Sequence, residues 1–559
     1  MSVRFHYKYP LVFTAIFAVL GVALSVHALI LITLLLGIIS YLKLIGIREY
    51  WIIFQAIWLG FGSLTFQKSR YKIAQNDISR GSCIQVEIES INKTQNGIKV
   101  IAKNRSVYLD SNWVSQSDFK VQWLQIEDLD IIPGCLVLLQ DYKFRVPKIN
   151  KIPISFNEYN YFMGLGILGN LDVSNSRLYA LDMDSASLDF QRYNLKKNLM
   201  SRMSPFFSSR SFALFLGLLL GDKSYLESQD KQLFQRAGLM HILSVSGMHI
   251  GLIYWLISWP ISILGKRYYA IKKFEIALIP VLWAYAHLTG MAPPVLRATA
   301  FISVLMVLRI LFKRKVRLPD LIASSACLFV IFSPLEFYSV SFQLSFAAML
   351  GIAFWFPLWQ ENWRKYLNRM NGVGDLLGMS LCCTFTTLPL TLYHFHQIPT
   401  WFLLGNLTLT LPLTFLIYVF SAHVLFAWLD VEFITKFISY LVEFLVDFIY
   451  QGLALIEALP LPFLFAYDFG FVDALFLSIL IVMVWRYAVK LPILSKDQIV
   501  IAVFIWVIID VLGFNKAKSK VQFDEGIRCS YNQMPGLIKW AQAHSNDTLY
   551  VSSSNIDYP

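Results

Sequence analysis

Long apolar runs recur along most of this chain, and short polar segments separate them. Many windows of about 17 or more residues carry almost no charge, which is long enough for a helix to cross a bilayer. Residues 11–42 provide the length for a tight pair of crossings and residues 50–66 for a third, and further runs follow from residue 274. The pattern predicts a polytopic α-helical membrane protein.

Basic residues give the expected orientation of these runs. They precede the first run, and clusters at residues 266–273, 313–317 and 364–369 fall in loops that alternate crossings place on one side. Cytoplasmic loops of membrane proteins collect Lys and Arg. We therefore expect the N-terminus in the cytoplasm and residues 67–187 on the opposite side of the membrane.

The composition supports this class and excludes several functions. The chain has 559 residues, of which 56% are hydrophobic and 15% charged, whereas soluble domains are roughly 45–50% apolar and about 25% charged. Basic cytoplasmic loops account for most of the net charge of +12, so the charge does not by itself indicate nucleic-acid binding. The sequence contains no Gly-x-x-x-x-Gly-Lys phosphate loop and no metal-ligand spacing. We predict no metal, no cofactor and no ATP hydrolysis.

Residues 67–187 show the alternation of β-strands. Cys83–Ile91 alternates with a period of two, Gly97–Ala102 and Arg105–Leu109 predict a hairpin, and Gly134–Gln140 predicts a further strand. Short strands separated by polar turns favour a small extracytoplasmic β-barrel, of which an OB-like fold is one option.

Two of the six cysteines, Cys83 and Cys135, lie in this predicted β domain. If the domain faces an oxidising compartment, they could form a disulfide. The alternative is a pair of buried free thiols, and the sequence does not decide between the two.

The next segments complete the domain plan. Residues 188–210 are basic and amphipathic, which predicts a helix at the membrane surface or a phosphate-attracting patch. Residues 212–221 are apolar but too short to span, so we expect a buried or re-entrant piece. The predicted units are transmembrane helices at 1–66, the OB-like β domain at 67–187, the interfacial helix at 188–210, a transmembrane channel domain at 211–513 and a polar tail at 514–559.

The stretch Ala237–Leu256 combines apolar composition with polar side chains and glycines. Polar groups inside a membrane segment usually face a protein interior or a water-filled path, and glycines allow helices to break or to approach closely. The alternative is a tightly packed helix whose hydroxyls bond to their own carbonyls. The candidate path residues are Asp222, Gly238, His241, Ser244, Ser246, Gly247, His249, Arg297 and Gln343.

Several sequence blocks resemble one family. Leu216–Ser224 (LGLLLGDKS) and Leu233–Gly251 (LFQRAGLMHILSVSGMHIG) resemble the core signature of the ComEC family of competence DNA channels. Further blocks fit the family in the same order, up to about residue 513. They are Asn150–Tyr161, Pro294–Ala298, Ser333–Leu335, Ser341–Ala347, Leu388–Pro399 and Gly405–Leu413.

The resemblance implies a function and a set of partners. Family members import single-stranded DNA across the inner (cytoplasmic) membrane during natural transformation, through a helical channel that follows an OB-like external domain. Many members carry a metallo-β-lactamase-like nuclease domain, but the sequence lacks its His-x-His-x-Asp-His motif. We therefore expect a channel with no catalytic residues. Its expected partners are single-stranded DNA, membrane lipid, a periplasmic or surface DNA receptor, and a cytoplasmic helicase or translocase that supplies the motive force.

Two alternatives to this function stay open from the sequence. One is a permease for another anionic or lipid-linked substrate, and the other is a membrane hydrolase that uses Ser246 with His241 or His249. In the external domain, aromatic residues lie near basic ones, as single-strand binding sites require, although a half-buried β-surface has the same composition. The aromatic residues are Trp113, Trp123, Tyr142 and Phe144.

Overall fold

The computed structural model describes most of the chain, and the following account is restricted to that part. The described residues are 47–94, 97–109, 112–115, 119–125, 132–147, 158–174, 176–183, 187–243, 245, 247–264, 268–312, 318–366, 371–466, 469–488, 529–530 and 556–557. The pair of crossings predicted for residues 11–42 lies outside them, as do Ser244 and Ser246.

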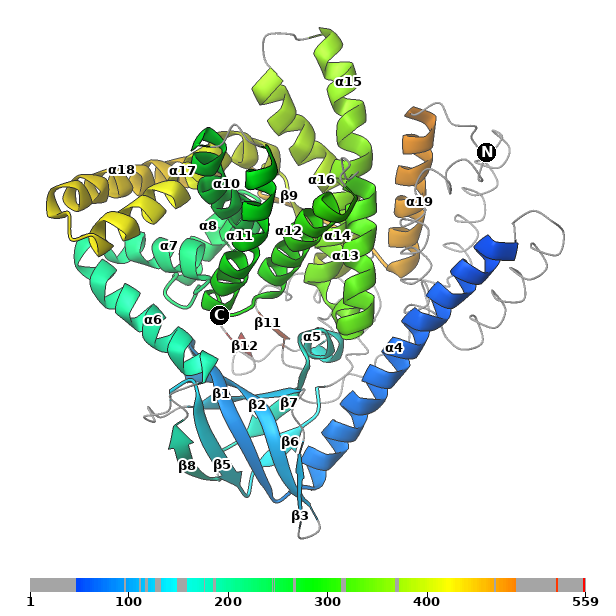
Figure 1. The fold of residues 1–559 in the computed structure, drawn as a ribbon, viewed down its shortest axis with the longest axis vertical. Coiled ribbons are helices and arrows are strands. Elements are labelled where there is room, and N and C mark those ends of the chain that lie inside the picture. Colours follow the sequence, from blue (N-terminus) through cyan, green and yellow to red (C-terminus); the bar gives the residue numbers. More distant parts are fainter. Residues whose placement is uncertain are drawn as a thin grey trace, which may run out of the picture.

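An eight-stranded sheet forms the lower part of the molecule in Figure 1. Its main path runs β6-β7-β4-β2-β1-β5-β8, and β3 pairs with β2. All pairs are antiparallel except β4 with β7. The strands are β1 Cys83–Thr94, β2 Gly97–Leu109, β3 Asn112–Ser115, β4 Lys120–Gln125, β5 Cys135–Gln140, β6 Lys143–Arg145, β7 Ile167–Asp172 and β8 Arg177–Met183. The path ends at β6 and β8, so the sheet is a half-barrel.

The hairpin predicted within residues 97–109 is wrong. These residues form the single strand β2, which pairs with β1 on one side and with β4 and β3 on the other. The polar residues at its centre resembled a turn. They continue the strand instead, because the Asn104 N–H bonds to the Phe119 carbonyl at 2.9 Å and the Lys103 and Arg105 side chains pair with acids.

The core of the β domain explains the alternation in its sequence. Ile84, Val86 and Ile88 of β1 are fully buried on the inner face of the sheet. The helix α4 (Ile47–Arg80) continues well past residue 66, where the sequence suggested that a crossing ended. Its second half packs against the same core through Tyr71 and Ile78. The structural unit therefore includes this part of α4.

The register of the sheet separates Cys83 from Cys135. Cys83 lies opposite Gln140, and four residues along the pair Glu87 lies opposite Leu136, so the cysteines are at opposite ends of the β1–β5 pairing. At about 3.3 Å per residue they are well beyond the roughly 7 Å that a disulfide tolerates between Cα atoms. Both thiols are free in the structure, and the considered disulfide is not formed.

Helices make up most of the remaining described chain (Figure 1). They are α5 Glu158–Leu165, α6 Leu188–Met203, η1 Ser204–Phe206, α7 Ser209–Leu220, α8 Ser228–Arg236, α9 Met240–Leu243, α10 Gly247–Leu264, α11 Tyr268–Leu288, α12 Pro293–Phe312, α13 Leu318–Phe332, η2 Pro334–Tyr338, α14 Val340–Leu350, η3 Gly351–Trp355, α15 Phe356–Tyr366, α16 Asn371–Phe395, α17 Phe402–Trp428, α18 Glu432–Glu457 and α19 Phe471–Ala488. Two short ladders accompany them: β9 Gln397–Pro399 with β10 Phe463–Phe465, and β11 Cys529–Ser530 with β12 Ile556–Asp557.

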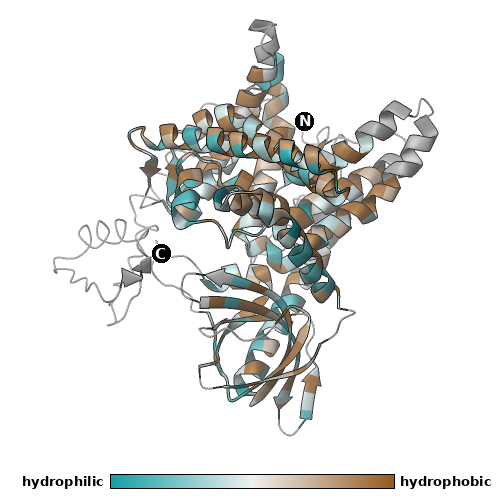
Figure 2. Cartoon of the chain, turned by 90° about the vertical axis from the view of Figure 1, so that its left-hand side faces the viewer, coloured by the Kyte–Doolittle hydropathy of each residue, from teal (hydrophilic) through white to brown (hydrophobic). Residues whose placement is uncertain are grey.

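Three of the described helical segments are long and apolar enough to cross a membrane: Val340–Glu361, Gly372–Phe395 and Phe402–Trp428. Shorter apolar helices surround them, and Figure 2 shows that apolar residues cover much of the helical region. The mostly helical fold with membrane-length apolar helices that the sequence predicts is thus confirmed. The helix α7, predicted as a buried short piece, has most of its residues buried in a core that it shares with α8, α9, α17 and α18.

Candidate functional site

The glycine-broken stretch after α8 is tightly packed at its start. Gly238 adopts a left-handed backbone (φ +73°), and a Cβ there would lie 2.6 Å from the Cβ of Phe402. On the facing helix, a Cβ at Gly405 would lie 2.2 Å from the Ala237 carbonyl oxygen. Two glycines therefore let this turn and the start of α17 meet without side chains between them. The role of Gly238 in the structure is to allow this turn to pack closely against α17.

The two histidines of the stretch face different surroundings. His241 on α9 is exposed, and its Nδ1 lies 3.1 Å from the Gly238 carbonyl oxygen. His249 on α10 is only 1% exposed. The structure thus does not bring both imidazoles to one surface, and a hydrolase that used His249 would first have to open this helix contact.

Gly247 begins α10 and lies beside α12. A Cβ at Gly247 would make ordinary contact with the Ala298 Cβ at 3.4 Å, and the residue is otherwise exposed. Val245 packs with Val295 in the core that α10, α11 and α12 share. The Val245 side chain also reaches Gly221, where a Cβ would lie 3.4 Å from its Cγ2. Three of the sequence blocks that carry the family resemblance therefore converge here.

Asp222 follows the left-handed Gly221 that ends α7. Its carboxylate accepts hydrogen bonds from the Ser224 N–H at 3.1 Å and from the Lys196 ammonium at 2.5 Å. Burial raises the pKa of Asp222, but Lys196 and Ser224 outweigh it and lower the pKa below its ordinary value. The carboxylate is thus held ionised, and it ties α6 to the loop after α7.

Arg297 lies in the second turn of α12 and is 3% exposed. Its Nη2 donates to the Ser341 carbonyl oxygen at 2.8 Å and to the Ser341 hydroxyl at 2.7 Å. Its Nη1 lies 3.8 Å from the Glu336 carboxylate. The guanidinium therefore joins α12 to the η2–α14 junction, and in this structure it is a buried bridging group.

Gln343 extends this network to a second helix. Its amide donates to the Phe337 carbonyl oxygen at 3.0 Å, and its oxygen lies 2.7 Å from His394 Nε2 of α16. The same junction contacts the β domain: a Cβ at Gly164 of α5 would lie 2.8 Å from the Ser339 Cβ, and Lys68 of α4 donates to the Tyr338 hydroxyl at 2.7 Å. Arg297 and Gln343 are thus brought together at this junction, whereas Gly238 packs against Phe402 at the start of α17.

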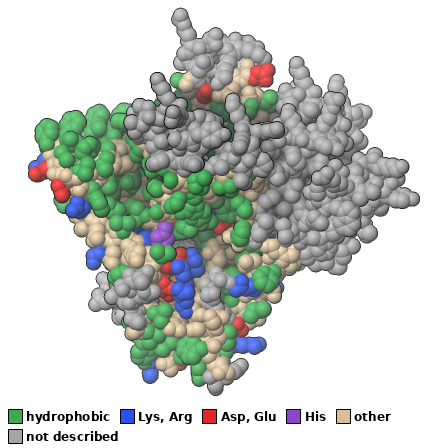
Figure 3. All heavy atoms as spheres, viewed as in Figure 1, with side chains coloured by type: hydrophobic (Ala, Val, Ile, Leu, Met, Phe, Trp, Pro, Cys, Tyr) green, Lys and Arg blue, Asp and Glu red, His purple; other side chains and the backbone are tan. Residues whose placement is uncertain are grey.

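A band of charged side chains of both signs lies between the sheet and the helices (Figure 3). Lys103 pairs with Asp189 at 2.5 Å, and Lys120 pairs with Glu89 at 2.7 Å. Arg192 of α6 donates to the Glu89 carbonyl oxygen at 2.5 Å and also pairs with Asp189 at 3.3 Å. The cations of this charged band are paired with acids. The helix α6 therefore connects the sheet to the helices through charged groups.

Two of the four aromatic residues considered for DNA stacking belong to the protein core. Trp123 is 2% exposed and Tyr142 is 9% exposed, so for these two residues the structure favours the alternative of a buried β-surface over stacking on DNA. Each sits on the inner face of a strand or turn where the sheet packs on itself and on α4. Trp113 differs, since it is 49% exposed on β3 and packs beside Tyr108 with ring centroids 5.3 Å apart.

Sequence reasoning missed three members of these networks: Lys196, Glu336 and Ser341. Glu336 is the fourth residue after the apolar run of α13, and it lies between the two blocks Ser333–Leu335 and Ser341–Ala347 that resemble the family. An acid so close to an apolar run, in a chain with an Arg in another apolar run, could have indicated this ion pair.

Residues 218–492 match the family model described as Competence protein. The chain carries the competence domain of the ComEC family. The resemblance inferred from the sequence is therefore confirmed, and the convergent blocks around Gly221, Gly247 and Arg297 lie inside this competence domain.

The chain is similar to several curated proteins. It is 28% identical over 251 residues to ComE operon protein 3 of Bacillus subtilis, a match that covers 45% of this chain and 30% of that protein. It is 25% identical over 232 residues to Recombination protein 2 of Haemophilus influenzae, covering 38% and 29%. An uncharacterised Aquifex aeolicus protein is 30% identical over 192 residues, covering 33% and 44%. Each match spans less than half of the relative, and no solved structure matches the chain.

Proposed function

We propose that this protein conducts single-stranded DNA across the cytoplasmic membrane during natural transformation. The observation that carries the proposal is the competence-domain match over residues 218–492. Three membrane-length helical segments within that region supply the scaffold that a membrane path requires.

The place where three family-like blocks converge supports a position for the path. The blocks at Gly221, Gly247 and Arg297 meet there, and the exposed Gly247 lies beside Ala298, the residue that follows Arg297 in α12. We propose that Gly247 leaves room for the strand, while Arg297 and Gln343 position α12, α14 and α16 around it. Asp222, Gly238 and His249 hold the helices that form the wall, and the exposed His241 faces the path.

The charged band suggests how a polyanion would be received. Lys103 and Lys120 are each about one-third exposed, with acidic partners on β1 and α6. Phosphates compete effectively for exposed cations, because counterions are released when they bind. In this proposal the sheet faces the outside of the cell and the N-terminus lies in the cytoplasm, where a helicase or translocase pulls the strand and a receptor delivers it from outside.

The test is DNA entry in a transformable host in which the gene is deleted. DNA labelled in one strand is expected to remain outside the cytoplasmic membrane, accessible to added nuclease in spheroplasts, and transformants are expected to disappear. The wild-type gene restores both. A deletion strain that transforms normally contradicts the proposal and favours a permease for another anionic or lipid-linked substrate.

Site variants test the position of the path. Gly247→Leu, which fills the space beside Ala298, is expected to abolish transformation at a normal protein level. Gly372→Leu is the matched control, because a Cβ at Gly372 meets no atom within 4 Å. Equal transformation in both variants would remove Gly247 from the path and leave the deletion result intact.

A further inference from the structure

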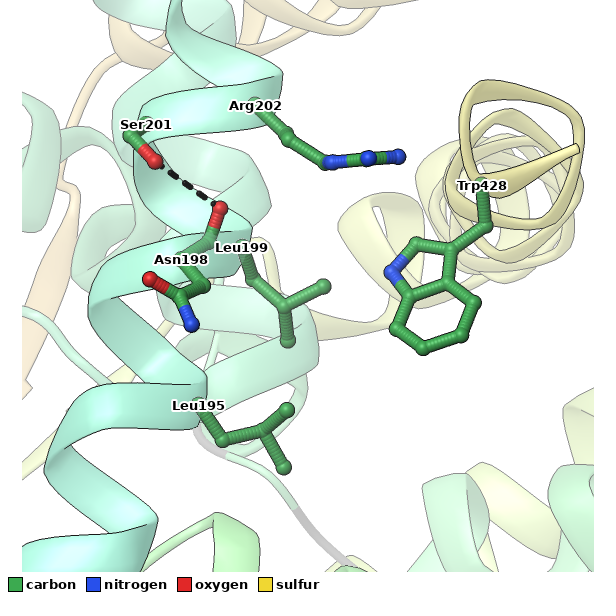
Figure 4. Close-up of a pocket in the computed structure, with 6 residues that line it drawn as sticks. All are labelled: Leu195, Asn198, Leu199, Ser201, Arg202 and Trp428. Carbon is green, nitrogen blue, oxygen red and sulfur yellow. Dashed lines mark hydrogen bonds between the residues drawn. The ribbon is translucent and has the colours of Figure 1, made fainter. Parts of the chain in front are cut away.

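A surface cavity of about 450 Å³ opens between α6 and the end of α17. Figure 4 shows Leu195, Leu199 and Arg202 extending from α6 on the side where the Trp428 indole lies. The residues that line the cavity are Leu195, Asn198, Leu199, Ser201, Arg202 and Trp428. Its volume is within the range of about 300–1,000 Å³ that small-molecule sites occupy.

The lining separates into an apolar and a polar part. Leu195, Leu199 and the Trp428 ring form the apolar wall, while Asn198, Ser201 and Arg202 contribute an amide, a hydroxyl and a guanidinium. An anion with an attached hydrocarbon part matches this division, since a guanidinium binds phosphate oxygens strongly and leucines bind alkyl groups.

The guanidinium is available to such an anion. Arg202 is half exposed, donates to the Ala427 carbonyl oxygen at 3.2 Å, and lies 3.7 Å from the carboxylate of Asp430. Asp430 is itself 83% exposed, so its pairing with Arg202 is solvated and weak. This differs from Lys196, six residues earlier on the same helix, which is held by the largely buried Asp222.

The position of the cavity identifies the anion as a lipid. Trp428 is the last residue of the membrane-length helix α17, and Trp at the end of a membrane helix lies at headgroup level. The chain then continues through exposed apolar residues, among them Leu429 at 62% and Phe433 at 85% exposure. A free phosphate would use the guanidinium but neither the indole nor this apolar surface.

We propose that this cavity binds the headgroup of an anionic phospholipid, with the phosphate on Arg202 and the glycerol and first acyl carbons against Leu195, Leu199 and Trp428. The site is independent of the DNA path. The sequence predicted a membrane-surface helix at residues 188–210. In this proposal only the last turns of α6 contact the membrane surface, because Arg192 and Lys196 of the same helix pair with acids of the protein.

The experiment measures lipid binding to the purified full-length protein in detergent by native mass spectrometry. Phosphatidylglycerol and phosphatidylcholine are titrated separately, and inorganic phosphate is tested as a competitor. We expect Arg202→Gln to weaken phosphatidylglycerol binding about fivefold, the effect of one basic residue at a charged membrane surface. Arg202→Lys is expected to retain most of the binding, and Trp428→Ala to weaken both lipids.

Arg177→Gln is the control, because Arg177 is exposed on β8 outside the cavity. Wild-type binding of phosphatidylglycerol by Arg202→Gln overturns the proposal. Displacement of the lipid by millimolar inorganic phosphate also overturns it, since the site would then be a simple anion site. Gel filtration of each variant shows that a lost adduct does not result from unfolding.

Discussion

Glycine has two separate uses in the stretch between α8 and α10. At Gly238 the backbone is left-handed and the neighbouring chain is too close for any side chain. At Gly247 the backbone needs no glycine and the nearest side-chain atom is at ordinary contact distance. Replacing the first should therefore damage folding, and replacing the second should fill space at the surface of α10.

Gly238→Ala should destabilise the protein. A left-handed backbone costs a residue with a Cβ about 1–2 kcal/mol, and the contact with Phe402 adds to this because the nearest atoms belong to its backbone and Cβ. The measurement is the thermal unfolding midpoint of the detergent-solubilised protein. Gly372→Ala is the control, with no clash and a gain in helix propensity. An unchanged midpoint for Gly238→Ala would show that this turn can relax.

Asp222 should contribute stability that is lost in acid. Its pKa is lowered in the folded protein, so the contribution is complete above the unfolded value of about 3.9 and disappears as the pH falls through the folded pKa. Asp222→Asn lacks this contribution at every pH. The difference in unfolding midpoint between wild type and Asp222→Asn should therefore shrink from pH 6 to pH 3. A difference that stays constant over this range would contradict the role assigned to the carboxylate.

At the scale of elements, the sequence predicted strands with regular alternation, but it did not predict polar segments that continue an element. The strand β1 was predicted because its inward residues alternate. The extension of α4 was missed because residues 67–80 are mostly polar, although Tyr71, Ala74 and Ile78 recur at helical spacing and are buried. Periodicity predicts a surface where one element packs, but it does not show where a partly polar element ends.

The candidate site was predictable to a similar extent. Unusual residues in apolar runs, such as Arg297 and Gln343, marked the elements that meet at the junction. The partners of Arg297, Glu336 and Ser341, were not predicted, because they lie 39 and 44 residues further along the chain and only tertiary packing brings them close. Sequence pattern showed which groups needed partners, and the fold supplied the partners.

The Arg297 network should behave as a coupled unit between α12 and η2–α14. Arg297→Met leaves the largely buried Glu336 carboxylate without its cation, and breaking a buried pair in this way costs about 3–5 kcal/mol. Adding Glu336→Gln removes the uncompensated charge, so the double variant should be more stable than Arg297→Met alone. Thermal unfolding of both single variants and the double variant gives the coupling energy. Strict additivity would show that the 3.8 Å pair contributes nothing.

At the scale of the whole molecule, two contacts between described residues stand out in attaching the sheet to the helices. The η2–α14 junction packs against α4 and α5, and α6 carries the charged band from the sheet to the loop after α7. Among the described residues, the contact at η2 is therefore mainly packed, and the contact at α6 is rich in ion pairs. Electrostatic contacts between partly exposed groups weaken with salt, so the two attachments should respond differently to ionic strength.

Asp189 is the central group of the electrostatic attachment, because it is 4% exposed and pairs with both Lys103 of β2 and Arg192 of α6. Asp189→Asn should leave two cations facing each other with no acid between them. We expect severalfold faster hydrogen exchange in α6 and in the facing part of β1, with little change at η2 and α14. High salt should reproduce part of this effect in the wild type. Asp172→Asn is the control, since the pair of Asp172 with Arg145 lies at the sheet edge and Arg145 is 72% exposed. Equal exchange in both variants would mean that packing at η2 alone holds the β domain in place.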